Sequence, residues 1–335
     1  HCRRLASGKL LCRRKREMQL PMTTALGWIL GGLLLPPLMG LWLFPTLTRA
    51  LLSDLRVPRI LHFAALGGLG MALRLRETGI SAETNWAELT VQLVAMIVVL
   101  AYAAVFAIVT NNLEDLEADR ISNPDRPLVR GSVDKRTYLL AGIAAQVLAL
   151  GFALLFPCLT SANRGMEPEL FLGILAISIG YYVYSCRPFR LKRVPIVAKL
   201  VIGFNSWVVA VCGYALAGGD WQQFPWIWSL FILLPLAFAA NFIDLKDTEG
   251  DRATGVATLP VLLGEVRARH VIALATLATY VMGGVLLGVS WVYPLNAVAA
   301  IAHIYLLYRQ PYDERGIFLV LLGSLLGLDI FLIWA

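Results

Sequence analysis

The sequence predicts an all-α fold, a polytopic bundle of membrane-spanning helices. The first observation is the composition, since 58% of the 335 residues are hydrophobic and only 15% are charged. The mean hydropathy of +0.70 is well above that of a soluble domain of this size. The second observation is that apolar stretches of roughly 17 to 25 residues recur, each long enough to cross a hydrocarbon core as a helix. Helices are expected because lipid offers no partners to backbone polar groups.

The first segment, residues 1–22, is a basic arm. Residues 1–20 hold seven Lys/Arg and one Glu, which together account for +6 of the net charge of +7. Once the arm is set aside no basic groove remains, so nucleic acid is excluded as a partner. An Arg-rich, acid-poor arm is typical of an organelle-targeting peptide. It also fits a cytoplasmic flank that fixes the orientation of the chain.

The second segment, residues 23–55, is apolar but contains Pro36, Pro37 and Pro45. We expect an extra apolar hairpin or an interfacial helix here, because a full crossing would leave the basic arm outside. The five cysteines of the chain are dispersed and lack metal-ligand spacing. This argues against both a zinc site and a disulfide framework.

The third segment, residues 56–335, is predicted to form a domain of nine transmembrane helices. The expected spans are 58–73, 89–110, 137–157, 169–186, 196–217, 224–243, 270–289, 291–308 and 316–334. The connections on one side carry 16 Lys/Arg and those on the other side carry three. Because Lys and Arg collect in cytoplasmic loops, we expect an integral multi-pass membrane protein whose basic connections face the cytoplasm.

Two sets of polar residues follow the second and sixth spans on the predicted cytoplasmic side. The first set, in NNLEDLEAD, is Asn111, Asp115 and Asp119. The second set, in NFIDLKDTEGD, is Asp244, Asp247 and Asp251. If each set lies on a continuous helix, its members fall within about 80° and about 60° of one another, on one face. Glu114 and Glu117 face elsewhere and are expected to be solvated.

Converging carboxylates repel one another unless a cation binds between them, which makes a purely structural role for both sets improbable. Oxygen ligands without His or Cys indicate Mg²⁺ rather than zinc or copper. Magnesium held by few carboxylates completes its coordination shell with waters and substrate phosphates. We therefore predict a Mg²⁺ site that binds a diphosphate.

Basic residues near the aspartates fit the same substrate, because Arg makes bidentate contacts with phosphate and Lys acts as a point charge. The candidates are Arg120, Arg126, Arg190, Lys192 and Lys199. Taken singly, each is as readily explained as an interfacial charge that enforces topology. Two polar residues inside spans, His62 and Asn205, would be costly against lipid. They are candidates for substrate contacts or for hydrogen bonds between helices.

These motifs resemble the two signature regions of the UbiA-type intramembrane prenyltransferases. The matching residues are Asn111-Asn112-x-x-Asp115-x-x-x-Asp119 with Asn123-Pro124-x-Arg126-Pro127, and Asp244-x-x-Asp247-x-x-Gly250-Asp251 with Thr258-Leu259-Pro260. Tyr184-Ser185, Pro188 and Arg190-Leu191-Lys192-Arg193 are similar to a loop of the same family. Asn112 is a departure, since the family usually has Asp there. We expect this change to be tolerated.

The resemblance covers about Arg56 to Ala335 and implies nine helices around a central cavity. It also implies two Mg²⁺ ions that bridge an isoprenyl diphosphate to the aspartates, with Asn111 as an orienting ligand, and a lateral opening to membrane lipid. Arg126, Arg190 and Lys192 are the best candidates for diphosphate contacts, and Tyr184 and Lys199 are further substrate-binding candidates.

The predicted function is Mg²⁺-dependent transfer of a polyprenyl group to an aromatic acceptor, a quinone or chlorin precursor. Ionisation of the allylic diphosphate would be assisted by the metals and basic side chains. Three alternatives remain open: a terpene cyclase on the same scaffold, a prenyltransferase acting on a glyceryl phosphate lipid, and a non-enzymatic binder or transporter of prenyl lipids.

Overall fold

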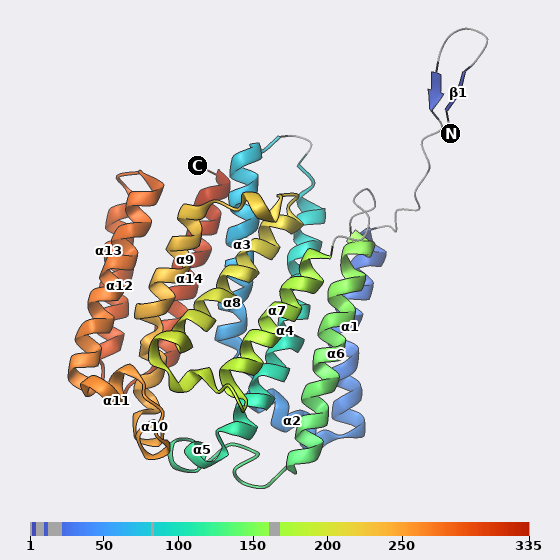
Figure 1. The fold of residues 1–335 in the computed structure, drawn as a ribbon. Helices are drawn as coiled ribbons and strands as arrows, with labels where there is room; N and C mark the ends of the chain where they lie inside the picture. The colour runs from blue at the N-terminus through green and yellow to red at the C-terminus, as the bar shows by residue number, and fades with distance from the viewer. Residues whose placement is uncertain (1, 5–9, 13–21, 82–83, 161–167, 335) are drawn as a thin grey trace.

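The computed structural model describes residues 2–4, 10–12, 22–81, 84–160 and 168–334. Long helices lie side by side in one bundle (Figure 1). Those after residue 55 are α3 (Val57–Thr78), α4 (Trp86–Glu114), α6 (Lys135–Thr160), α7 (Glu169–Ser185), α8 (Pro195–Leu216), α9 (Trp226–Phe238), α12 (Glu265–Leu287), α13 (Val292–Tyr308) and α14 (Glu314–Trp334). Each predicted span overlaps one of them, so the all-α prediction is confirmed.

Seven of the described helices are long and apolar enough to cross a membrane: α1, α4, α6, α8, α9 with its continuation, α12 and α14. The apolar helices α7 and α13 are shorter, and α3 carries three arginines between its ends. The predicted count of nine crossings therefore stays a prediction.

The N-terminal apolar segment forms two helices, α1 (Met22–Leu43) and α2 (Pro45–Asp54). α1 contains Pro36 and Pro37 within its length and packs along α4 and α6. Its N-terminal end lies at the end of the bundle opposite α5 and α10 (Figure 1). The predicted basic arm falls largely outside the described residues. Its described parts, β1 (Cys2–Arg4) and β2 (Leu10–Cys12), pair as antiparallel strands.

The helices α3 and α8 pack so closely that glycine is required on both. A Cβ atom on Gly70 would lie 1.8 Å from the carbonyl oxygen of Ala210, and one on Gly213 would lie 1.9 Å from that of Gly67. Small residues at such crossings let helix backbones approach in a membrane. On one side of this pair α4, α7, α6 and α1 pack in turn, and on the other α9, α12, α13 and α14 lead back to α3.

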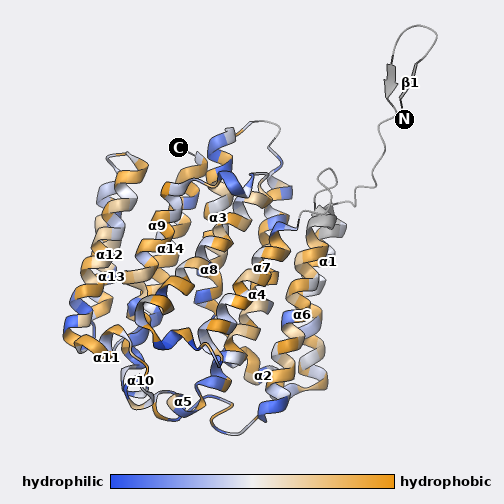
Figure 2. Ribbon diagram, in the orientation of Figure 1, coloured by the Kyte–Doolittle hydropathy of each residue, from blue (hydrophilic) through white to orange (hydrophobic). Residues whose placement is uncertain are grey.

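Short helical elements collect at one end of the bundle, where hydrophilic residues gather (Figure 2). They are α5 (Leu116–Ser122), η1 (Leu191–Arg193), η3 (Ala239–Lys246), α10 (Thr248–Thr254) and α11 (Leu259–Leu263). A further short helix, η2 (Trp221–Gln223), precedes α9. Both aspartate sets therefore lie at the same end, with α5 packed against α10.

Candidate active site

Each aspartate set straddles a break between two helical segments. Asp115 ends α4 and precedes α5, with φ −98° and ψ 10°. Asp247 ends η3 and precedes α10 with nearly the same backbone angles, φ −99° and ψ 6°. The expectation of one continuous helix through each set is therefore wrong. These angles fall in a sparsely populated region that active-site residues often occupy.

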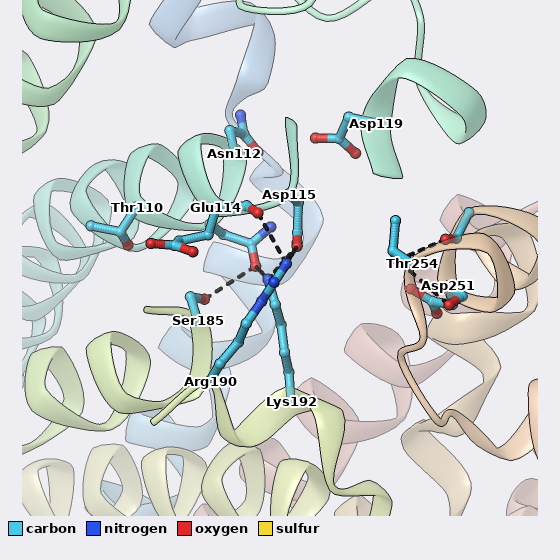
Figure 3. A network of polar contacts seen from close by, with 12 residues as sticks. Thr110, Asn112, Glu114, Asp115, Asp119, Ser185, Arg190, Lys192, Asp251 and Thr254 are labelled. Carbon is cyan, nitrogen blue, oxygen red and sulfur yellow. Dashed lines mark hydrogen bonds and ion pairs between the residues drawn. The ribbon is translucent and has the colours of Figure 1, made fainter. Parts of the chain in front are cut away.

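The side chain of Asp115 is held by basic residues of the segment that follows α7 (Figure 3). Lys192 Nζ donates to Asp115 Oδ1 at 2.5 Å, and Arg190 Nη2 lies 3.4 Å from the same oxygen. Arg190 also donates to the backbone oxygen of Glu114 at 3.0 Å. Asn111 joins the cluster, because its Oδ1 accepts from Ser185 Oγ at 3.1 Å and lies 3.4 Å from Lys192 Nζ.

Asp119 connects the two sets through Asn123. The amide Nδ2 of Asn123 donates to Asp119 Oδ1 at 3.0 Å and to Asp247 Oδ1 at 3.2 Å. Arg126 forms an ion pair with the other oxygen of Asp119. Burial raises the pKa of Asp119 above its ordinary value, and the adjacent Arg126 guanidinium opposes this effect. The first and second motifs thus meet in space, although 124 residues separate Asn123 from Asp247.

The second set carries an excess of negative charge. Lys199 Nζ lies 2.7 Å from Asp244 Oδ2, and the side chain of Lys199 is 5% exposed. Burial, with the neighbouring carboxylates of Asp244 and Asp247, raises the pKa of Asp251 to about 7. A carboxyl group shifted in this direction indicates a place where a cation would be stabilised.

The donor set fits magnesium, since it consists of carboxylate and amide oxygens. Within the described residues, however, no group of three His, Cys, Asp or Glu side chains lies close enough to hold a metal ion by itself. Basic side chains pair instead with Asp115, Asp119 and Asp244. An ion bound here would need oxygens from both motifs and from a ligand, as Mg²⁺ bound through substrate phosphates does.

The aspartates line one end of a cavity of about 810 Å³ that continues into the bundle. Next to them the cavity is lined by Arg56, Arg59, Tyr184 and Lys192. Its inner walls are largely apolar, with Leu66, Leu69, Leu100, Ala103, Phe231, Leu236, Leu287 and Phe331 among the lining residues. The structure therefore supplies the central cavity that the resemblance implied.

Most of the predicted site residues come together, and two do not. His62, Arg126, Tyr184 and Lys199 line the cavity with the aspartates. Arg120 points away, because it pairs with Glu117 at 3.0 Å on a surface where its side chain is 58% exposed. Asn205 is fully buried against α7, where a Cβ on Gly180 would lie 2.3 Å from its Oδ1. Neither side chain lines the cavity, so their contact with substrate stays a prediction.

Sequence reasoning missed three residues that the structure brings to the site. Asn123 was read as part of a motif and not as the link between the two sets. Arg56 and Arg59 precede and begin α3, and the only available signal was their charge next to Pro58.

Asn112, the departure noted above, accepts from Arg126 at 3.0 Å and donates to the hydroxyl of Tyr138 at 3.1 Å. Asn112 was therefore noticed in the sequence, and the structure adds that it helps to position the guanidinium that pairs with Asp119.

The fold and site define a class: a membrane helical bundle with two aspartate motifs at one end of a largely apolar cavity. The model of the UbiA prenyltransferase family matches residues 63–317. The chain therefore belongs to the UbiA prenyltransferase family. It is an integral, multi-pass membrane protein and a prenyltransferase.

Relatives within the family act on different acceptors, to judge from their names. The chain is 33% identical over 239 residues to the digeranylgeranylglyceryl phosphate synthase of Methanopyrus kandleri, which covers 66% of this chain and 79% of the relative. It is 30% identical over 252 residues to the bacteriochlorophyll synthase 33 kDa chain of Cereibacter sphaeroides, covering 65% and 73%.

Solved structures share the fold. A UbiA homologue from Archaeoglobus fulgidus bound to GPP and Mg²⁺ superposes with a TM-score of 0.62 at 20% identity, covering 85% of this chain and all of that one. The structure of a UbiA homologue from Aeropyrum pernix superposes with a TM-score of 0.61 at 18% identity, covering 83% and 98%.

Proposed function

We propose that this protein transfers a polyprenyl group from an isoprenyl diphosphate to a glyceryl phosphate lipid, with two Mg²⁺ ions as cofactor. The observation that carries the proposal is the meeting of the two aspartate sets, through Asn123, at one end of a largely apolar cavity. The acceptor differs from the aromatic one that the sequence favoured. The change rests on the digeranylgeranylglyceryl phosphate synthases among its relatives.

The metal ions would be held by Asp115, Asp119, Asp244, Asp247 and Asp251, with Asn111 beside them. Bound Mg²⁺ neutralises the charge that develops on the leaving diphosphate and so favours cleavage of the allylic C–O bond. The Archaeoglobus fulgidus homologue supports this assignment, since its structures contain Mg²⁺ with DMAPP or GPP.

Basic side chains of this chain would bind the diphosphate itself. Lys192, Arg126 and Lys199 each contact an aspartate and line the cavity. The same donors that pair with a carboxylate can pair with phosphate oxygens. The apolar walls would keep water from the reactive allylic carbon until the acceptor attacks. The aspartates and these basic side chains lie at one end of the bundle. The excess of Lys and Arg in the connections at that end supports its placement on the cytoplasmic side.

A second group of cations favours an acceptor that carries a phosphate. Arg56 and Arg59 line the cavity. Arg59 pairs with Glu314, but within the described residues no carboxylate lies within ion-pair distance of Arg56. The adjacent Arg59 guanidinium, together with burial, lowers the pKa of Arg56 to about 10. A second anion near these side chains would relieve their mutual repulsion, and a glyceryl phosphate would supply it. A neutral quinone precursor would not.

The test is a product assay with the purified full-length protein in lipid nanodiscs. Labelled geranylgeranyl diphosphate and Mg²⁺ are supplied with geranylgeranylglyceryl phosphate or with an aromatic acceptor. We expect diphosphate release and a prenylated ether lipid with the first acceptor. Product with the aromatic acceptor alone would overturn the acceptor assignment. A cyclised hydrocarbon formed without any acceptor would make the protein a cyclase, and an unchanged donor under all conditions would make it a binder or transporter.

A further inference from the structure

A group of polar side chains lies inside the cavity, away from the aspartates, on the helices α12, α13 and α14. The group comprises Thr276, Tyr280, Asn296, His303 and Ser324, all of which line the cavity. Thr276 is 11 residues from the start of α12 at Glu265, a distance of about 16 Å along the helix. The cavity residues of α3 and α4 at comparable depth, such as Leu69 and Leu100, are apolar. At this depth the wall formed by α12, α13 and α14 is therefore polar, whereas Leu69 and Leu100 of α3 and α4 are apolar.

Part of this group is satisfied by internal hydrogen bonds and part is not. The hydroxyls of Tyr280 and Ser324 lie 3.2 Å apart, and Asn296 Nδ2 donates to the backbone oxygen of Tyr280 at 2.8 Å. His303 is 0% exposed and Thr276 is 1% exposed. Both ring nitrogens of His303 and the hydroxyl of Thr276 lack a hydrogen-bond partner among the described residues. Unpartnered polar groups at such depth are costly, and an ionisable one such as His303 indicates a functional site.

Within this group His303 lies on the side toward the aspartates. The ring of His303 packs edge-on against Phe242, with centroids 5.7 Å apart, and against Tyr280, at 6.3 Å. Phe242 is two residues before Asp244 in η3. A group bound to His303 would therefore sit near the first carbons of a prenyl donor whose diphosphate lies between the aspartates.

The donor cannot satisfy these groups. Beyond its diphosphate an isoprenyl chain consists of carbon and hydrogen, which neither donate nor accept a strong hydrogen bond. Of the two substrates, the acceptor is the one that can hydrogen-bond His303 and Thr276, because an acceptor attacked by an allylic cation carries oxygen close to the reacting atom. A glyceryl lipid brings hydroxyl and ether oxygens, and an aromatic acceptor brings hydroxyl or carbonyl oxygens.

We propose that Thr276 and His303 form a subsite that hydrogen-bonds an oxygen atom of the acceptor. This inference rests on the proposed function and adds where the acceptor lies. The acceptor occupies the wall formed by α12, α13 and α14, and the apolar wall of α3 and α4 is left to the donor chain.

The experiment compares KM for acceptor and donor in three single variants of the full-length protein. Thr276→Val removes the hydroxyl and keeps the shape, and His303→Leu removes both ring nitrogens. Thr279→Val is the matched control, because the hydroxyl of Thr279, three residues along the same helix, already donates to the oxygen of Ala275 at 2.8 Å. We expect the acceptor KM to rise about tenfold in the first two variants, the size of one lost hydrogen bond. The donor KM should be unchanged in all three.

An equal rise in donor KM, or an unchanged acceptor KM in Thr276→Val, would overturn the subsite. If His303→Leu does not fold, Thr276→Val still decides, because it preserves volume. A milder loss in His303→Gln than in His303→Leu would support hydrogen bonding over packing. Activity of the wild-type protein distinguishes failure of the subsite from failure of the proposed function. Product formed by the wild type with no effect of Thr276→Val defeats the subsite alone, whereas no product with either class of acceptor defeats the function.

Discussion

The contact between the two motifs through Asn123 yields a quantitative prediction. The variant Asn123→Ala removes the hydrogen bonds to Asp119 and Asp247, at 3.0 and 3.2 Å. Hydrogen bonds to charged groups contribute about 1.5–3 kcal/mol each. Because Asn123 is half-buried, water would replace part of the lost hydrogen bonding. We therefore take about 1.5 kcal/mol as the free energy lost with the two hydrogen bonds together. At about 1.4 kcal/mol per factor of ten, the Mg²⁺ concentration for half-maximal activity should rise about tenfold.

The assay follows diphosphate release at saturating donor over a Mg²⁺ titration. Asp125→Ala is the matched control, because Asp125 lies in the same segment, its side chain is 85% exposed and it pairs with Arg130. The control should titrate like the wild type. An Asn123→Ala variant with an unchanged Mg²⁺ requirement would refute the idea that this amide holds the motifs together.

Three further outcomes are expected. Asp247→Asn should lower diphosphate release by roughly 10²–10³-fold, as loss of a group that stabilises developing charge does, whereas Glu117→Ala, at an exposed position, should retain wild-type rates. Gly70→Leu should lower the melting temperature in detergent, because its side chain would collide with the backbone of Ala210 and overpacking costs about 1–3 kcal/mol or more; an unchanged melting curve would contradict the close crossing of α3 and α8. Ala103→Trp should narrow the cavity along α4, where Ala103 lines it, and shift donor preference from longer to shorter isoprenyl diphosphates in a competition assay, and an unchanged preference would mean that the chain does not reach this residue.

The sequence was sufficient for the helices and for placing both aspartate sets at one end of the bundle, because both depend on local composition. Apolar runs of sufficient length predict helices regardless of their neighbours, and carboxylates at the ends of such runs need a cation. The positions of Arg120 and Asn205, which do not line the cavity, could not be predicted from the sequence because they depend on which face of its helix each side chain occupies. Arg120 and Glu117 lie three residues apart on α5 and pair on its exposed face.

Long-range pairing explains what sequence reasoning missed. Asn123 contacts a residue of the second motif, and His303 contacts Phe242 from a helix 61 positions further along the chain. Periodicity within one segment carries no information about such partners. Arg56 and Arg59 came to notice because they line the cavity, a property that no local pattern encodes.

The glycine in the second motif has a structural reason in the same geometry. A Cβ atom on Gly250 would lie 2.2 Å from Ser122 Oγ and 3.1 Å from the backbone oxygen of Ala118, so α10 touches α5 where it has no side chain. The breaks at Asp115 and Asp247 turn these two short helices toward each other across the end of the cavity. Asn123 can then reach both carboxylates, since it follows Ser122 directly. The spacing of Asp247, Gly250 and Asp251 therefore serves the docking of α5 on α10 as much as the supply of carboxylates.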